Sequence, residues 1–134
     1  MTNNAKAVGA ITLFVSNPVA SRDFYARALD LPVVYQDEVA ATLKMGNLLL
    51  NLLKVSEAAE LIEPANVGNA SDGARFQLTI WVDDADAACA DLRAKGVALL
   101  NGPVDRPWGV RTAAFADPDG HAWEIAQQLP SAPS

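Results

Sequence analysis

Residues 76–96 read "FQLTIWVDDADAACADLRAKG", an apolar strand-like run followed at once by a helix-like run. The β-branched and aromatic residues at the start favour a strand, and Asp83 or Asp84 can cap the helix that follows. Gly96 can end that helix. Three more strand-like runs come next, namely "VALL" at 97–100, "VRTAAFAD" at 110–117 and "HAWEIAQ" at 121–127. This half of the chain is therefore predicted to run strand–helix–strand–strand–strand.

The first half of the chain follows the same plan. "AITLFVSN" at 10–17 favours a strand, and Asn17 followed by Pro18 is typical of a helix N-terminus. Three strand-like runs follow, namely "DLPVVYQ" at 30–36, "VAATLKMG" at 39–46 and "NLLLNLLKV" at 47–55. Helical spacing predicts one shared apolar face in the helix, made of Val19, Phe24, Ala28 and Leu29.

This internal repeat predicts the architecture. Val15 and Val82 end the two opening strands and lie 67 positions apart. A repeated order of elements predicts an α+β fold in which two βαβββ modules, at about 7–54 and 76–128, form one domain. The linker 55–75 is expected to hold about one helical turn. The head at 1–4 and the tail at 129–134 are expected to be disordered.

Composition excludes several classes of protein. The 134 residues carry a net charge of −6 and no basic run, which argues against nucleic acid and anionic membranes as partners. The single cysteine excludes an intramolecular disulfide and a cysteine-based zinc site, and it favours a cytoplasmic location. The apolar stretch "AVGAITLFV" at 7–15 has the length of a signal-peptide core, but the same pattern recurs inside the chain. We therefore expect it to be a strand.

Two longer stretches carry a resemblance to a known family. They are "FVSNPVASRDFYARALDL" at 14–31 and "RPWGVRTAAFADPDGHAWEI" at 106–125. With the paired repeat, they resemble the vicinal oxygen chelate superfamily, which includes glyoxalases, extradiol dioxygenases, fosfomycin-resistance enzymes and bleomycin-resistance proteins. The resemblance implies a curved mixed sheet, with the site in a cup between the two repeats. Fold alone does not fix the function.

Strand alternation predicts which side chains face the cup. In the two opening strands these are Ala10, Thr12 and Phe14, and Gln77, Thr79 and Trp81. The two closing strands each hold one polar residue in an apolar run, Asn51 in the first and Glu124 in the second. These two residues fall at matching places in the repeats.

The resemblance also implies where a metal would bind. In metal-dependent members four cup positions supply His and Glu ligands, and here they correspond to Ala10, Asn51, Gln77 and Glu124. Only Glu124 has the expected type, whereas divalent transition metals generally need about three or four imidazole, thiolate or carboxylate donors. We therefore expect no metal and no other cofactor. His121 is three residues from Glu124, so it should point to the other face and pack beside the hairpin.

Glu124 leaves four roles open. It can be a solvated surface carboxylate, or it can be buried and accept hydrogen bonds from Gln77 or Asn51. It can bind a cationic ligand, or it can carry a proton as a general acid or base. Arg111, after the "PWG" turn, can pair with Glu124 or with an anion, although an exposed strand arginine is the simpler interpretation.

Three aromatic residues fit a ligand cup. Phe14 and Trp81 occupy equivalent cup positions, and Trp108 lies on the loop before a cup strand, where it can form a wall or a lid. The alternatives are core packing for Phe14 and Trp81 and a loop anchor for Trp108. Cys89 lies among alanines on the second helix and is expected to be a small buried residue.

These residues favour a small-molecule binding protein of the glyoxalase/bleomycin-resistance type over an enzyme. We expect it to be metal-independent and to hold an aromatic or cationic organic molecule. Antibiotic resistance is the expected role. The resemblance implies a homodimer. The alternatives are a metal-dependent lyase or dioxygenase, a metal-free acid/base catalyst using Glu124, and a filled cup that serves protein association. The predicted contacts are Phe14, Asn51, Gln77, Trp81, Trp108 and Glu124.

Overall fold

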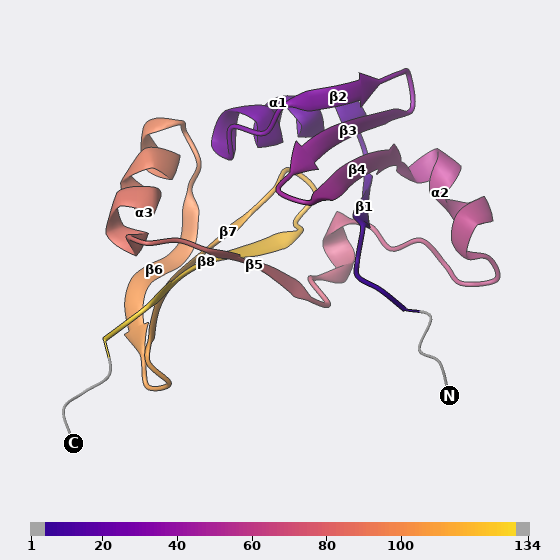
Figure 1. The fold of residues 1–134 in the computed structure, drawn as a ribbon. Coiled ribbons are helices and arrows are strands. Elements are labelled where there is room, and N and C mark those ends of the chain that lie inside the picture. The colour runs from indigo at the N-terminus through magenta and orange to yellow at the C-terminus, as the bar shows by residue number, and fades with distance from the viewer. Residues whose placement is uncertain (1–4, 131–134) are drawn as a thin grey trace. The chain divides into compact units, whose positions relative to one another are not determined.

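The computed structural model describes residues 5–130, whose elements are labelled in Figure 1. The chain divides into two compact units, of which the first ends at Gly68 and the second begins at Asn69. Of the segments predicted to be disordered, 1–4 and 131–134 lie outside the described residues. Leu129, at the start of the predicted tail, donates its backbone N–H to the carbonyl oxygen of Gly109 at 2.9 Å.

The first unit forms a four-stranded mixed sheet in the order β1-β4-β3-β2. β1 runs parallel to β4, and the other neighbours are antiparallel. Its elements are β1 (Ala10–Val15), α1 (Pro18–Ala28), β2 (Val33–Gln36), β3 (Ala40–Met45), β4 (Leu48–Lys54) and α2 (Val55–Ile62).

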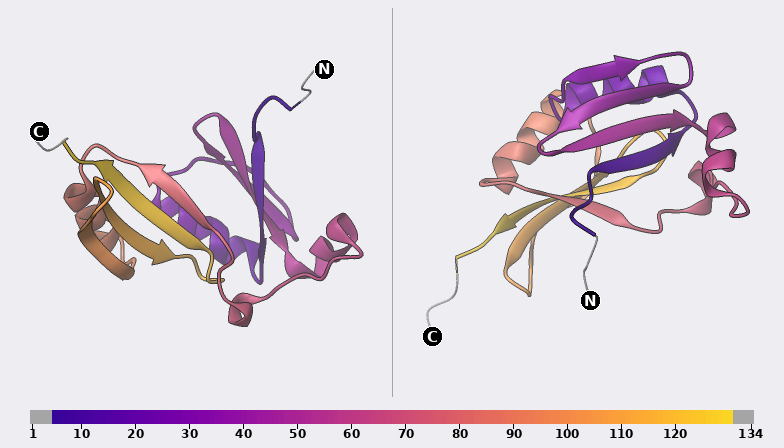
Figure 2. Two further views of the ribbon diagram at one scale, coloured as in Figure 1. Left: turned by 90° about the horizontal axis from the view of Figure 1, so that it is seen from below. Right: turned by 45° about the vertical axis from the view of Figure 1, so that its right-hand side comes forward.

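The second unit repeats this sheet in the order β5-β8-β7-β6, with β5 parallel to β8. The predicted α+β class and the two βαβββ repeats are therefore confirmed. Figures 1 and 2 show that in each repeat the helix after the first strand lies along one face of its own sheet. The elements are η1 (Ala70–Asp72), β5 (Gln77–Trp81), α3 (Ala85–Ala94), β6 (Leu99–Arg106), β7 (Val110–Ala116) and β8 (Ala122–Gln128).

Side-chain caps start both helices at the predicted residues. Asn17 Oδ1 accepts the backbone N–H groups of Val19 and Ala20 at 3.1 and 3.2 Å, with Pro18 in the first helical turn. Of the two candidate caps for α3, Asp84 is the one used, and its Oδ1 accepts the N–H of Ala87 at 3.0 Å. Each cap satisfies donors that the first turn of a helix leaves unpaired.

The core of the first unit lies between α1 and its sheet, and the predicted apolar face of α1 is right only in part. The buried helix residues are Pro18, Ser21, Tyr25 and Ala28, whereas Val19 is 44% exposed. The pattern misled because Tyr25 supplies the large buried surface, with its ring edge-to-face on Phe24 at 5.2 Å. Because tyrosine is only weakly apolar, the periodicity of apolar residues did not select Tyr25 for the core.

The core of the second unit lies between α3 and its sheet. Phe115 of β7 and Trp123 of β8 are both buried and stack with ring centroids 6.3 Å apart. Cys89 of α3 is also buried, as predicted. Burial raises the pKa of the Cys89 thiol, which makes it a small hydrophobic residue and not a nucleophile.

Two elements are longer than the sequence predicted. The linker contains α2, which runs for 8 residues, where about one turn was expected. β6 continues to Arg106, well past the predicted end at residue 100, because two register shifts let the strand pass through Gly102 and Pro103. The Gly-Pro pair thus marks an irregularity within a strand and not its end.

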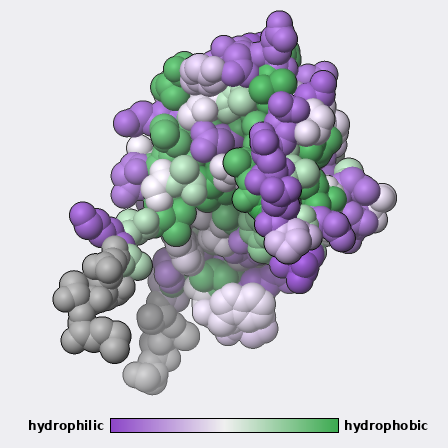
Figure 3. All heavy atoms as spheres, turned by 90° about the vertical axis from the view of Figure 1, so that its right-hand side faces the viewer, coloured by the Kyte–Doolittle hydropathy of each residue, from purple (hydrophilic) through white to green (hydrophobic). Residues whose placement is uncertain are grey.

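None of the helices among residues 5–130 has the length and apolar character needed to cross a membrane. On the face of the molecule drawn in Figure 3, hydrophobic and hydrophilic residues are interspersed. Single exposed apolar residues are ordinary in folded proteins.

Gly102 offers a test of the β6 irregularity. Its φ is +83°, and a Cβ there would lie 2.4 Å from the carbonyl oxygen of Thr112. Gly109 also has a positive φ, +89°, but a Cβ there would meet nothing within 4 Å. We expect Gly109→Ala to cost roughly 1–2 kcal/mol of unfolding free energy from backbone strain alone. Gly102→Ala should cost about 1–3 kcal/mol more. Urea unfolding of both variants measures this, and equal losses would contradict the close approach of β6 to β7.

Candidate functional site

The exposed face of the second sheet carries the predicted cup residues of β5. Gln77, Thr79 and Trp81 are exposed, whereas the alternating Leu78 and Ile80 are half-buried on the α3 side. Trp81 is 61% exposed. The core-packing alternative for Trp81 is therefore wrong within this unit, because most of its indole is open to contact.

Glu124 lies on this same face, paired in register with Thr79 of the neighbouring strand. The Thr79 hydroxyl donates to Glu124 Oε1 at 2.9 Å. Thr79 was predicted to lie on this face, but the expected donors to Glu124 were Gln77 or Asn51. Glu124 is half-buried, so it combines a fixed hydrogen bond with access to a ligand. We call this surface, formed by Gln77, Thr79, Trp81, Glu124 and their neighbours, the Glu124 face.

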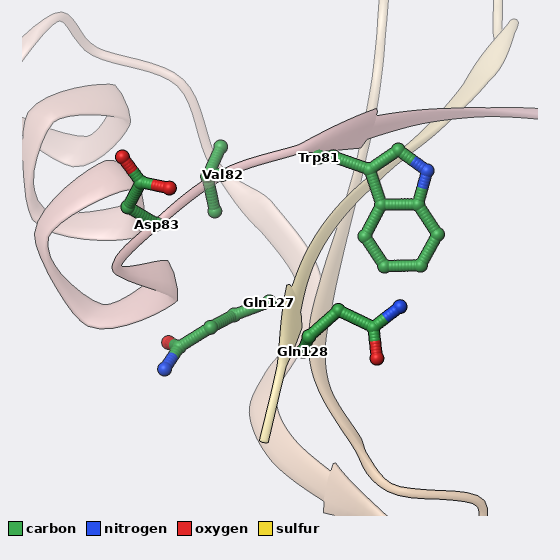
Figure 4. A pocket seen from close by; sticks show the side chains of 5 residues that line it. All are labelled: Trp81, Val82, Asp83, Gln127 and Gln128. Carbon is green, nitrogen blue, oxygen red and sulfur yellow. The ribbon is translucent and has the colours of Figure 1, made fainter. Parts of the chain in front are cut away.

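An open hollow of about 560 Å³ lies where β5 and β8 end. Figure 4 shows Trp81 and Gln128 together on one side of the strands, with Asp83 and Gln127 on the other side. The side chain of Gln127 is already hydrogen-bonded, because its Oε1 accepts the backbone N–H of Ala85 at 2.8 Å. The amide of Gln128 is exposed beside the indole and extends the Glu124 face by one polar group.

The first sheet carries a matching but neutral row. Thr12 pairs in register with Asn51, as Thr79 pairs with Glu124 in the second sheet. Asn51 Oδ1 accepts the Thr42 hydroxyl at 2.8 Å, and Asn51 Nδ2 donates to Thr12 Oγ1 at 3.3 Å. The amide of Asn51 is therefore held within its own sheet.

The remaining candidates of the first unit follow the predicted alternation. On β1, Ala10 and Thr12 are exposed, Phe14 is half-buried, and Leu13 and Val15 are buried in the core. Phe14 therefore belongs to the same face as Asn51. It offers only part of its ring, in contrast to the equivalent Trp81.

Trp108 lies in the tight turn between β6 and β7. Its side chain is 71% exposed, so it does not anchor the loop by packing. The turn is held instead by the backbone, where the Gly109 N–H donates to the Arg106 carbonyl oxygen at 3.1 Å. An indole presented in this way is available for contact with a ligand or another surface.

Arg111 faces away from Glu124. In β7 it pairs in register with Gln127, on the α3 side of the sheet, and it forms ion pairs with Asp105 at 2.6 Å and Asp86 at 2.9 Å. The hydrogen bond between Arg111 and Asp105 raises the pKa of Arg111 and lowers the pKa of Asp105. The suggested pairing of Arg111 with Glu124 is therefore wrong.

Arg106 is a site residue that the sequence did not predict. It pairs in register with Val110, which places it on the Glu124 face. Its Nε donates to the buried Thr112 hydroxyl at 2.9 Å, and its Nη2 donates to Asn101 Oδ1 at 3.4 Å. Alternation continued through 101–106 would have predicted this face, but the strand was expected to end at residue 100.

His121 stabilises the turn before β8. Its Nδ1 lies 2.8 Å from Oδ2 of the buried Asp117. Asp117 Oδ1 also accepts the backbone N–H groups of Asp119 and His121, each at 2.9 Å. The hydrogen bond to the carboxylate raises the pKa of His121, although partial burial opposes the rise. His121 is thus used by the turn, in agreement with the predicted packing beside the hairpin.

A model of the Glyoxalase/Bleomycin resistance protein/Dioxygenase superfamily matches residues 7–125. The chain belongs to this superfamily. Solved structures of similar fold include a glyoxalase/bleomycin resistance protein/dioxygenase from Nocardioides, with 22% identity, a TM-score of 0.86 and coverage of 98% of this chain and 89% of that one. No match was found among curated proteins.

Two further structures of similar fold belong to proteins with different functions. TnmS3, an antibiotic binding protein from Streptomyces sp. CB03234, is 27% identical with a TM-score of 0.70, and the match covers 95% of this chain and 99% of that one. A lactoylglutathione lyase from Agrobacterium tumefaciens is 20% identical with a TM-score of 0.72, and the match covers 92% of this chain and 94% of that one. Proteins of this fold therefore include both a binding protein and an enzyme.

The residues at the four positions implied for a superfamily metal do not fit one. Ala10 has no donor atom, and Asn51 Oδ1 already accepts a hydrogen bond from Thr42. Glu124 is the one anionic donor among the four positions, and it accepts from Thr79. Among residues 5–130 no three His, Cys, Asp or Glu side chains are grouped so that they could hold a metal ion.

The His121–Asp117 contact predicts how stability varies with pH. The pKa of His121 is raised in the folded protein. The contact therefore contributes fully to the unfolding free energy below the unfolded pKa of about 6.5, and this contribution is lost as the pH rises through the folded pKa. The difference in unfolding free energy between wild type and His121→Gln should therefore shrink as the pH increases from about 5.5 upward. Urea unfolding across this range measures it.

Asp117→Asn serves as the control, because it removes the charge that raises the pKa of His121. In that background, His121→Gln should give a difference with little pH dependence over the same range. A wild-type difference that stays constant, or grows, with rising pH would contradict the role of this contact.

Proposed function

We propose that this chain is a metal-independent small-molecule binding protein that holds an aromatic, cationic organic molecule. The observation that carries the proposal is the position of Glu124 beside Trp81. Glu124 is fixed by Thr79, and Trp81 is the next residue of β5 on the same face. A carboxylate and an exposed indole on adjacent strands lie within about 8 Å of each other, which is the reach of one aromatic ring with an attached ammonium group.

The physical chemistry of the Glu124 face suits such a ligand. The face of an indole attracts cations and flat rings, with energies of about 0.5–2 kcal/mol. The carboxylate adds a charge-assisted hydrogen bond to an ammonium donor. Gln77 and Gln128 flank this pair and supply neutral donors and acceptors that set the orientation of the ligand.

The remaining predicted contacts complete the proposal. We include Phe14, Asn51 and Trp108, the other predicted contacts, among the residues that bind this ligand. Similarity to an antibiotic binding protein supports binding as the function and an antibiotic-like molecule as the ligand. A homodimer in the cytoplasm remains part of this proposal.

An enzymatic role is the second candidate, and one observation favours its metal-free form. Glu124 is the acidic group on its face, and it is both half-exposed and oriented by a neutral hydroxyl. A carboxylate held in this way can take or give a proton at a bound molecule. The metal-dependent form is disfavoured by the residues at the four implied metal positions.

Charge selectivity tests the proposed binding role. We expect Glu124→Gln to weaken 1-naphthylmethylammonium roughly tenfold and to leave the neutral 1-naphthylmethanol within about twofold, because only the cation loses a charge-assisted bond. Trp81→Ala should weaken both. Titration followed by the Trp81 indole N–H resonance measures each affinity.

Glu60→Gln, an exposed substitution on α2 with the same charge change, is the matched control and should leave both affinities unchanged. Equal losses of the cation and the alcohol in Glu124→Gln would contradict charge pairing by Glu124. Turnover that survives a chelator and disappears in Glu124→Gln would favour the metal-free enzyme.

Metal retention tests the proposed independence from metals. After incubation with excess Ni²⁺, Mn²⁺, Zn²⁺ and Fe²⁺ and desalting, elemental analysis should find far less than one metal per chain, because the donors are mostly neutral or already bonded. Retention near one per chain that is abolished in Glu124→Ala would overturn this part of the proposal.

A further inference from the structure

Arg106 gives the Glu124 face a second charge, of opposite sign. Its guanidinium is held by two neutral acceptors, the Thr112 hydroxyl and the Asn101 amide oxygen. Among residues 5–130 no carboxylate forms an ion pair with Arg106, whereas Arg111 on the other face is paired with two. An arginine that is oriented but not neutralised is suited to bind an anion with its remaining N–H groups.

The sheet register places this cation in line with Glu124. Asn101 pairs with Ala114, Ala114 pairs with Glu124, and Glu124 pairs with Thr79, so these residues form one row across all four strands. Neighbouring strands lie about 4.8 Å apart, so Asn101 and Glu124 are separated by about 10 Å. The guanidinium, bonded to Asn101 and to Thr112 of β7, reaches into this interval.

The residue between the two charges is small. Ala114 separates Asn101 from Glu124 in the row and is buried, so a ligand would contact the ends of the two charged side chains and not the strand between them. Arg106 and Glu124 are each half-buried, so both keep an accessible surface. The two charges therefore lie on the same face of the sheet, on either side of Ala114.

We propose that the ligand is bipolar, with an ammonium group bound by Glu124 and a carboxylate bound by Arg106 and Asn101. A flat ring between these ends would lie beside Trp81. This inference rests on the proposed binding function and narrows its ligand class to aromatic amino acids in the broad sense. A ligand with only the cationic end would leave the Arg106 charge without a partner.

The test uses 4-(aminomethyl)benzoate, whose two charged groups lie at opposite ends of one ring. Its methyl ester keeps the shape and the amine, and 4-methylbenzoate keeps the acid alone. With the full chain, we expect 4-(aminomethyl)benzoate to bind roughly tenfold more tightly than either analogue, because each analogue loses one charge-assisted contact. The indole N–H of Trp81 and the Nε–H of Arg106 should both shift on titration.

Two arginine variants test which side chain binds the carboxylate of the ligand. Arg106→Gln should reduce the affinity for 4-(aminomethyl)benzoate to that for its ester and leave the ester unchanged. Arg111→Gln removes the same charge from the opposite face and should change neither. Arg106→Gln could lose its fold because the buried Thr112 hydroxyl loses its partner. In that case, comparing the acid with its ester in the wild-type chain still tests whether the carboxylate contributes to binding.

The outcomes separate this inference from the proposed function. Equal affinities for the acid and its ester, with binding of 1-naphthylmethylammonium still dependent on Glu124, would overturn the bipolar ligand and leave the binding function in place. Acid selectivity that persists in Arg106→Gln would overturn the role of Arg106. Failure of the naphthyl and benzoate probes alike would overturn the binding function, and this inference with it.

Discussion

The parallel pairing of the first and last strand in each repeat is the constraint on which the site depends. A parallel pair needs a long connection, and here the helix and two strands supply it. Because the helix covers one face of the sheet, the other face is left for polar residues. The pairing also joins residues that are distant in sequence, since Thr79 and Glu124 are 45 positions apart and Thr12 and Asn51 are 39 apart.

The two repeats use this scaffold for different chemistry. In the first, Asn51 is bonded to threonines on both neighbouring strands, so its row is neutral and internally satisfied. In the second, the residue equivalent to Thr42 is Ala114, which cannot bond to Glu124. One side of the carboxylate is therefore left open. The duplicated architecture thus holds one closed polar row and one row with a free charge.

The sequence predicted the features that follow from strand periodicity and local capping. The faces of β1 and β5, the caps at Asn17 and Asp84 and the burial of Cys89 all depend on nearest neighbours. Features that depend on tertiary context were missed. Arg106 was overlooked because Gly102 and Pro103 normally end a strand, whereas here bulges against β7 absorb them. Thr79 was not recognised as the donor to Glu124, because that bond depends on the exact register of two distant strands.

The alternation along β8 also bears on how such a protein can change over generations. Trp123 and Ile125 belong to the core, while Glu124 between them contributes a side chain to the opposite surface. Substitutions at Glu124 or Thr79 therefore alter recognition with little loss of the packing that keeps the chain folded. New binding preferences can arise here by single replacements, without prior stabilising changes elsewhere. Related proteins can therefore share this backbone and differ in the ligands that they bind.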